Sequence, residues 1–501
     1  METKRIVFII SLFFIFFSAL AQTETSYRAE TFGSLASGKN TPFWITNHNW
    51  GVIALDANNF YVRGSVFHEQ KLNKDWSFDA GIDLLGANSS NYGNFWIQQL
   101  YGRVNWKIWR LDIGSREDYV SLLNPFLSSG DFIHSNNARP IPQVKLSIPQ
   151  FLLVPYTKGN MYIKGDFALG YYLDSKWLED KAKPYNQSYV KDILSHTKSL
   201  YFRFGDIETK NKMQFTFGVQ HAAQWGGKLY KYTYIDNKWQ YNIINQPQGL
   251  GDLARVLIAK EGSEGSSPAD RAYVAGSHLG TYLFKYDYKL KNHQMSAYIH
   301  HFFEDGTGML FENYPDNLYG LEFRSSQKSL LSGVVFEYLY SKQQTGPIHL
   351  GALGADHNIR PRDKGGNDNY YNNTDYVQGP SHFGKTLGTS LFLSPEYNTL
   401  GNVNFEGSRV IAFHLGLEGY VRPELQYRLL LTTGQNWGRY YVPFTEVRKG
   451  FASQLELIYD YPKVEDLTVK LSLGYDNGRF FGGNTFGGGI TLSKTGIIRA
   501  K

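Results

Sequence analysis

The sequence predicts an all-β protein, a transmembrane antiparallel β-barrel of about 18 strands with long extracellular loops and a short helix in one loop. Three observations point to this fold. Segments of about ten residues alternate apolar and polar side chains, aromatic residues crowd the segment ends, and short connections alternate with long ones. No internal run approaches the roughly 20 apolar residues that a membrane-spanning helix needs.

The chain begins with a predicted signal peptide, Met1 to Ala21. Lys4 and Arg5 form its basic start, an apolar middle follows, and Ala19-Leu20-Ala21 is a small-residue cleavage pattern. The alternative is a membrane anchor, but an apolar run of about 12 residues is too short to span a bilayer. We therefore expect an exported mature chain from about Gln22. Because no linker splits the rest, residues 22–501 are expected to form one barrel domain.

The composition supports many short strands and excludes several other classes of protein. The 501 residues include 50 Gly, and 16% are aromatic, whereas only 19% are charged. Cys is absent, which excludes disulfides and thiolate metal sites, and the sequence predicts no metal or other cofactor. The formal charge of +6 falls to +5 without the leader, which is too small and scattered an excess to indicate a nucleic-acid partner.

The stretch LTVKLSLGYDNG, residues 467–478, shows the alternation of side chains most clearly. Its odd-numbered residues from Leu467 to Tyr475 are apolar, and the even-numbered residues between them are Thr, Lys, Ser and Gly. Successive side chains of a strand point to opposite faces, so we expect an apolar face toward lipid and a polar face toward a lumen. The same pattern recurs near residues 199–207, 317–326, 409–421 and 451–461.

A soluble β-sandwich would also alternate and is the competing interpretation. A cysteine-free sandwich of this size would be expected to divide into repeated modules, and the sequence contains no such repeat. The order of short and long connections also favours the barrel.

The expected strands place every long connection at one end of the barrel, as the parity rule for a chain that starts in the periplasm requires. The strand near 143–154 is the least regular because Pro149 interrupts it. The strands are expected near residues 25–35, 58–71, 76–86, 95–105, 109–116, 143–154, 160–173, 199–207, 213–221, 279–290, 294–303, 317–326, 331–341, 409–421, 425–434, 451–461, 467–477 and 485–495. The long connections are residues 36–57, 117–142, 174–198, 222–278, 304–316, 342–408 and 435–450.

The loops carry few signals of catalysis. Leu250, Leu253, Val256 and Leu257 have helical spacing, which predicts a short helix that plugs or caps the mouth, or simply packs inside it. The adjacent residues His300 and His301 would point to opposite faces of a strand and so make an improbable metal pair. Glu304 and Asp305 could form a glycosidase pair, although neighbouring acids are common in loops. The segment EGSEGSSPADR predicts a flexible linker.

Long motifs give the chain a resemblance to a known family. They are NTPFWITNHNWG (40–51), NARPIPQ (137–143), GVQHAAQWGG (218–227), HHFFEDGTGMLFENYPDNLYGLE (300–322), SGVVFEYLYSKQQTGPIH (332–349), GNDNYYNN (366–373), LFLSPEYN (391–398) and NWGRYYVPF (436–444). On these motifs the chain resembles the capsule assembly protein Wzi family, in the form found in Bacteroidetes, from about Thr41 to Tyr461. The resemblance implies an occluded outer-membrane barrel of 18 strands. Such a barrel acts as a non-enzymatic lectin that binds capsular polysaccharide and helps attach and organise the capsule.

The motifs and the loop chemistry together nominate candidate contacts to polysaccharide. Aromatic rings stack on sugar rings, while Asn, Asp and Arg hydrogen-bond hydroxyls or carboxylates. The alternatives are packing of the lumen and, for residues 342–408, a flexible solvated loop. The candidates are Trp44, His48, Trp50, Arg139, Trp225, Arg360, Arg362, Tyr370, Tyr371, Asp375, Trp437 and Arg439.

The C-terminus departs from the usual barrel pattern. Bacterial barrels usually end on an aromatic residue that the insertion machinery reads, whereas this chain ends SKTGIIRAK. Either the last strand ends near Ile497 and leaves a short basic tail, or Phe486 serves as a shifted signal. The expected partners are capsular polysaccharide, outer-membrane lipid and lipopolysaccharide, and the barrel-insertion machinery.

Three function hypotheses remain, of which the surface lectin is preferred. A porin would conduct through its polar lumen, and an outer-membrane glycan- or lipid-processing enzyme would depend on one Glu, Asp or Ser side chain.

Overall fold

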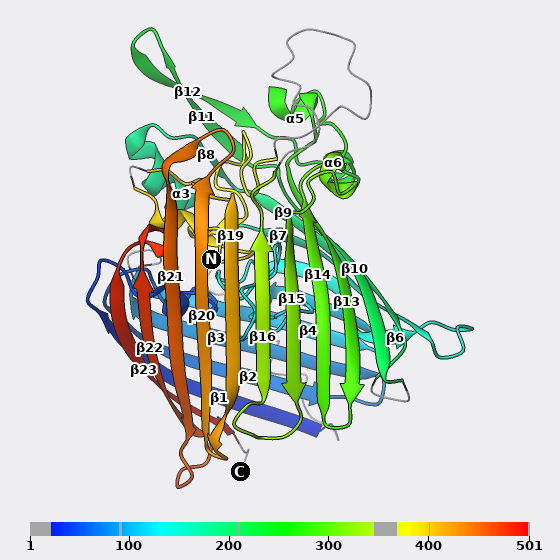
Figure 1. Cartoon of the computed structure of the whole chain (residues 1–501). Helices are drawn as coiled ribbons and strands as arrows, with labels where there is room; N and C mark the ends of the chain where they lie inside the picture. The colour runs from blue at the N-terminus through cyan, green and yellow to red at the C-terminus, as the bar shows by residue number, and fades with distance from the viewer. Residues whose placement is uncertain (1–21, 90–92, 208–210, 345–367, 400, 499–501) are drawn as a thin grey trace, which may run out of the picture.

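The computed structural model describes residues 22–89, 93–207, 211–344, 368–399 and 401–498. Its main feature is one closed sheet of 18 antiparallel strands, shown in Figure 1. The strands are β1 (Gln22–Ala36), β2 (Asn59–Lys71), β3 (Trp76–Asn88), β4 (Phe95–Trp106), β5 (Trp109–Ser115), β6 (Gln143–Leu153), β7 (Met161–Tyr171), β9 (Leu194–Phe204), β10 (Met213–Trp225), β13 (Ser277–Leu290), β14 (His293–Phe303), β15 (Asn317–Ser325), β16 (Gly333–Tyr340), β19 (Val410–Arg422), β20 (Leu425–Gly438), β21 (Pro443–Asp460), β22 (Leu467–Asn477) and β23 (Thr485–Ile497).

Pairing of the first strand with the last closes the sheet. β1 pairs with β2 on one side and with β23 on the other, from Ser26↔Ile497 to Ala36↔Gly487. The sheet therefore has no free edge, which satisfies the backbone hydrogen bonds without water. The last strand ends at Ile497, as one of the two sequence interpretations expected. The predicted signal peptide, Met1 to Ala21, lies outside the described residues.

The two faces of the barrel wall follow the predicted alternation. In β22, Leu473 is 38% exposed and Tyr475 is 45% exposed, whereas Ser472 and Asp476 point inward and are buried. In β19, Phe413 faces outward and the neighbouring His414 is buried inside. The outer surface is thus an apolar band, and the polar side chains line the lumen.

All the expected strands form, and their long connections lie at one end. We call this end the loop end and the opposite end the short-turn end. The connection expected at 435–450 is the exception, because β20 and β21 continue past their neighbours as a paired ribbon up to Gly438↔Pro443. Only residues 439–442 connect these two strands, so the prediction of a long loop there is wrong.

The remaining short elements all belong to the loop end, where they fold over or into the barrel. None of the helices among the described residues is long and apolar enough to cross a membrane. These elements are α2 (Phe43–Thr46), α3 (Ser175–Ala182), η1 (Lys183–Tyr185), β8 (Tyr189–Lys191), β11 (Lys228–Ile235), β12 (Lys238–Asn245), α4 (Leu250–Leu257), α5 (Pro268–Ala272), α6 (Gly306–Met309), β17 (Ser381–His382), β18 (Lys385–Thr386), η4 (Pro395–Tyr397) and η5 (Arg479–Phe481).

Parts of three loops fill the loop-end half of the lumen and form what we call the plug, residues 37–58, 116–142, 368–399 and 401–408. Its aromatic residues form one core with inward-facing wall residues, for example Phe132 stacked on Phe302 with ring centroids 4.6 Å apart. Polar wall residues anchor the plug. Glu337 accepts hydrogen bonds from Ser128 Oγ at 2.6 Å and from Ser129 N at 2.7 Å, and His414 Nε2 lies 2.8 Å from the Leu127 carbonyl oxygen.

The β6 strand is irregular at the predicted position. Its register with β7 shifts between Ile148 and Leu152, around Pro149, which cannot donate a hydrogen bond to the ladder. The bulge lies near the short-turn end, and its residues Ile148 to Leu152 line a cavity there.

A charge on the apolar face is expected to destabilise the barrel. Leu471 pairs with Leu457 and Ile490 in the middle of this face. Leu471→Arg should cost about 2–4 kcal/mol if it lies at the membrane midplane, measured by denaturant unfolding from lipid vesicles. The matched control is Val464→Arg in the β21–β22 turn, for which a cost of about 0–1 kcal/mol is expected. Equal costs for the two variants would contradict a lipid-facing position of Leu471.

Candidate functional site

The predicted residue Trp44 lies inside the plug. It is 1% exposed, and its Nε1 donates a hydrogen bond to Thr432 Oγ1 on the barrel wall at 3.0 Å. Its ring lies 5.1 Å from that of His414 and 5.0 Å from that of His48. Both ring nitrogens of His48 are buried without a hydrogen-bond partner, and burial lowers the pKa of His48 to about 3. His48 is therefore a neutral packing residue here.

Tyr370 and Tyr371 are also buried in the plug, at 0% and 1% exposure. The Tyr370 hydroxyl donates to Asp316 Oδ2 at 2.9 Å, and the Tyr371 hydroxyl donates to the carbonyl oxygen of Phe132. These bonds tie residues 368–408 to the segment 116–142 and to the wall. Neither ring is available at the surface in this conformation.

Asp375 and Trp225 both contact residues of the loop between β10 and β13. Asp375 is fully buried, accepts a hydrogen bond from Ser267 Oγ and lies 3.7 Å from Lys231 Nζ. Ser267 also caps α5, so the segment predicted as a flexible linker is ordered around these buried polar contacts. Trp225 packs with Val256 of α4, which confirms the predicted helix and its contact with the barrel mouth.

The other predicted residues are distributed around the plug. Arg139 lies between aromatic rings, 5.6 Å from the Trp96 centroid and 4.7 Å from that of Phe383, and donates to the Ile97 carbonyl oxygen. Trp50 and Arg139 line a small internal cavity of about 120 Å³.

At the end of β20, Lys342 Nζ lies 4.3 Å from the Trp437 ring centroid, and burial lowers the pKa of the nearby Arg439. Arg360 and Arg362 lie outside the described residues. The predicted residues thus do not gather on one open surface. Their contact with polysaccharide stays a prediction.

An exposed aromatic surface does exist at the loop end, on the hairpin formed by β11 and β12. It stands out from the loop end, as Figure 1 shows. Its base is fixed because β11 also pairs with β8, where Leu229 is buried opposite Val190. Its two-residue turn, Asp236 and Asn237, has φ angles of 51° and 59°, the left-handed geometry of a tight hairpin turn.

One face of this hairpin is a ladder of rings, which we call the aromatic ladder. Tyr232 pairs with Tyr241, their ring centroids 5.3 Å apart, and Tyr234 pairs with Trp239 at 5.2 Å. Tyr234, Trp239 and Tyr241 are each half exposed or more. At the base, Tyr230 stacks on the buried ring of Tyr189 at 4.9 Å with an interplanar angle of 4°.

Sequence reasoning missed this surface although a signal was present. Tyr230, Tyr232 and Tyr234 alternate with other residues, a two-residue Asp-Asn turn follows, and Trp239 and Tyr241 repeat the spacing. That is the pattern of a two-residue hairpin with one aromatic face.

A cluster of buried carboxyl groups lies where the plug meets α6. Asp305 caps this helix by accepting hydrogen bonds from Thr307 N and Gly308 N, and Glu304 Oε1 accepts one from Tyr371 N at 2.7 Å. Burial, with the charges of Asp305 and Asp316, raises the pKa of Asp368 to about 8. Burial also raises the pKa of Asp316 to about 7 and holds the pKa of Glu304 well above its usual range. Glu304, Asp305 and Asp316 accept hydrogen bonds from backbone N–H groups. Among the described residues no group of three His, Asp or Glu side chains could hold a metal ion.

Comparison with known proteins shows the fold and no family. No family model and no curated protein matches the chain. Among solved structures, Wzi of Escherichia coli, described as an outer-membrane, carbohydrate-binding β-barrel involved in group 1 capsule assembly, matches with a TM-score of 0.54 at 12% identity. The match covers 93% of this chain and 83% of Wzi. What the two share is the barrel fold.

Two other outer-membrane structures match less well. OccAB4 of Acinetobacter baumannii has a TM-score of 0.45 at 10% identity, with 95% of this chain and 99% of that chain covered. OmpT of Vibrio cholerae has a TM-score of 0.39 at 8% identity, with 96% and 99% covered.

The carboxyl cluster predicts a pH-dependent plug. Asp368, Asp316 and Glu304 bind protons more tightly in the folded chain than in the unfolded one. They therefore stabilise the plug fully at acidic pH, and this contribution is lost as the pH rises from about 4 through about 8. Hydrogen exchange of residues 368–399, corrected for intrinsic rates, should show easier opening at pH 9 than at pH 5.

Asp368→Asn should weaken this pH dependence because its amide cannot ionise. The control is Asp180→Asn, which changes an exposed acid of α3 at the same end of the barrel. If Asp368→Asn and Asp180→Asn have the same pH profile, the carboxyl cluster is not responsible.

Proposed function

We propose that this protein is a non-enzymatic outer-membrane lectin that binds capsular polysaccharide and helps attach and organise the capsule at the cell surface. The observation that carries the proposal is the aromatic ladder at the loop end. The apolar C–H face of a pyranose ring packs against an aromatic ring, and tyrosine hydroxyls can hydrogen-bond its hydroxyl groups. A row of half-exposed rings fits a chain of sugar units better than a single small ligand.

The orientation of the barrel supports this location. In bacterial outer-membrane barrels the short turns face the periplasm and the long loops face outward. The hairpin would then project away from the cell, in contact with extracellular polysaccharide. The proposal includes export by the predicted signal peptide, insertion by the barrel-insertion machinery, and contact of the apolar band with outer-membrane lipid and lipopolysaccharide.

The plug argues against a diffusion channel. Aromatic packing and hydrogen bonds between the plug segments and wall residues such as Glu337 and His414 occlude the loop half of the lumen in the described residues. The acids Glu304 and Asp305, considered above as a catalytic pair, are occupied in a backbone hydrogen bond and a helix cap. Both features favour a binding protein over a porin or an enzyme.

The fold likeness to Wzi adds support, because that structure is described as carbohydrate-binding and involved in capsule assembly. Membership of its family, which the sequence motifs suggest, is part of the proposal. The first test is genetic. A strain that lacks this protein should make its capsular polysaccharide but release more of it into the medium than the complemented strain does. Unchanged retention of the polysaccharide would contradict a role in attachment.

The aromatic ladder gives a sharper test with the purified barrel. Trp239→Ala and Tyr241→Ala should each weaken binding of the organism's own polysaccharide about three- to tenfold, because each removes one stacking ring. Ile235→Ala is the matched control, since this residue is exposed on the opposite face of the same hairpin. Binding is measured by surface plasmon resonance on immobilised barrel. If the control loses as much affinity as the ladder variants, the ladder is not the binding surface.

A further inference from the structure

A second polar site lies at the opposite end of the barrel, away from the aromatic ladder. The lumen there holds an open cavity of about 880 Å³, lined by residues of β1 to β6. Lys107 and Ile108 of the β4–β5 turn belong to its lining, so it opens near the short-turn end. The β6 bulge, Ile148 to Leu152, forms another part of its wall.

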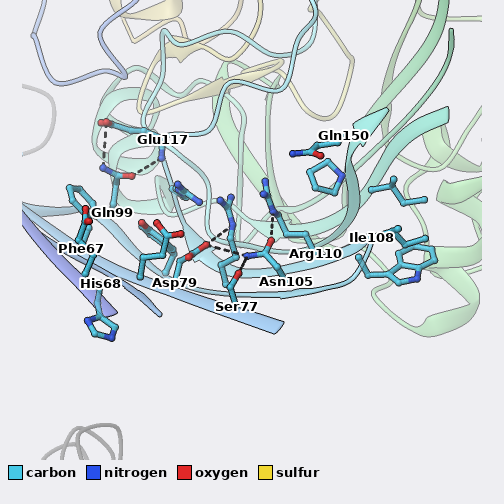
Figure 2. A pocket seen from close by; sticks show the side chains of 18 of the residues that line it. Phe67, His68, Ser77, Asp79, Gln99, Asn105, Ile108, Arg110, Glu117 and Gln150 are labelled. Carbon is cyan, nitrogen blue, oxygen red and sulfur yellow. Dashed lines mark hydrogen bonds and ion pairs between the residues drawn. The ribbon is translucent and has the colours of Figure 1, made fainter. Parts of the chain in front are cut away.

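Gln99 and Glu117, the latter at the start of the plug, are hydrogen-bonded to each other at the inner end of this cavity. Gln99 Oε1 accepts a hydrogen bond from Glu117 N at 2.9 Å, and Glu117 Oε1 accepts one from Arg63 Nη2 at 2.7 Å. Figure 2 shows Gln99 and Glu117 at one end of the cavity, with Asn105 and Arg110 toward the other. The cavity therefore opens near the short-turn end and reaches the start of the plug at its inner end.

Four arginines line the cavity, and because Arg28 is ion-paired with Asp83, three of them remain, Arg103, Arg110 and Arg116. The carboxylates of Glu24, Glu69, Asp79 and Glu117 also belong to its lining. Arg110 lies within electrostatic range of Arg103 and Arg116 and also of the carboxylates Asp112 and Asp118. Arg103 is largely neutralised by Asp112 and Asp118. In the described residues, Arg110 and Arg116 keep N–H donors without a hydrogen-bond partner.

The free donors belong to Arg116 and Arg110. Arg116 Nη1 is buried without a hydrogen-bond partner, and its guanidinium lies 4.6 Å from the Tyr101 ring centroid. Arg110 donates from Nε to Asn105 Oδ1 at 2.8 Å, and no hydrogen bond in the described residues involves its two Nη groups. Unpaired guanidinium donors beside one another favour an anion, which would satisfy them and relieve their repulsion.

The rest of the lining suits hydroxyl groups. Asn105 donates to Ser77 Oγ at 2.9 Å and to Asp79 Oδ2 at 3.4 Å, so these side chains form a row of donors and acceptors along one wall, visible in Figure 2. Gln150 on the β6 bulge and the ring of Tyr101 also belong to the cavity lining. Amides, a hydroxyl and aromatic rings beside arginines match a ligand with many hydroxyls and a few negative charges.

We propose that this cavity binds a saccharide that carries carboxylate or phosphate groups and enters from the short-turn end. Arg110 and Arg116 bind the anionic group, and the Asn105 row binds the hydroxyls. An acidic peptide fits less well, because the closed barrel leaves no free strand edge to pair with a peptide backbone. The inference does not rest on the proposed surface function.

Binding of defined oligosaccharides to the purified full-length barrel in detergent tests the proposal. By calorimetry, tetragalacturonic acid should bind at least about tenfold more tightly than the neutral cellotetraose. Arg110→Gln and Arg116→Gln should each weaken its binding about tenfold or more. Arg422→Gln is the matched control, because it removes the same charge at the same end of the barrel but outside the cavity. Glucose 6-phosphate shows whether phosphate replaces carboxylate as the anionic group.

Several other outcomes of these experiments would overturn the proposal. Tight binding of inorganic phosphate alone, with no gain from the sugar, would make this a simple anion site, and equally tight binding of tetraglutamate would favour a peptide. Equal losses in Arg110→Gln and Arg422→Gln, or no binding of any acidic saccharide, would also overturn it. Heat-modifiable gel migration checks that each variant is folded. Arg110→Lys keeps the positive charge but loses the two-pronged guanidinium donor group, so it should retain intermediate affinity.

Discussion

Closure of the sheet by β1 and β23 is the constraint on which the rest of the structure depends. A strand in contact with lipid cannot leave its backbone groups unpaired, and the pairing from Ser26↔Ile497 to Ala36↔Gly487 removes the last free edge. A barrel of 18 strands is too wide for wall side chains alone to fill. The lumen must then hold either water or folded chain, and here parts of three loops fill the half at the loop end.

The plug is held by apolar packing together with hydrogen bonds between buried polar groups of the plug and the wall. Glu337 is one example, since it is buried and accepts hydrogen bonds from both Ser128 and Ser129. Trp44 is another, because a buried indole on a plug helix finds its partner on the wall at Thr432. Side chains engaged in this way are withdrawn from ligand binding. The aromatic ladder beyond the plug and the arginine-lined cavity below it keep side chains that are not engaged in this way, and they lie at opposite ends of the barrel.

The fold was largely predictable from the sequence, whereas the site was not. Strand positions, the outward face of Leu473 and Tyr475, the α4 helix and the irregularity at Pro149 all follow from patterns within a few residues of each other. The prediction failed at residues 435–450, because how far two strands stay paired depends on their partner and not on their own alternation. Tyr370 and Tyr371 looked like surface aromatics in a polar loop, and nothing local indicated that they would be buried against Phe132 and Asp316.

The sequence by itself determined the barrel, its two faces and the end at which the long loops gather. Side-chain alternation can be read within a single strand, and the end at which a loop lies follows from counting the strands before it. The tertiary structure alone decided which aromatic and charged side chains are buried and which are left exposed. That outcome depends on contacts such as Trp44 with Thr432, 388 positions apart in the chain. Contacts of this kind join residues far apart in the chain, so no short stretch of sequence contains them.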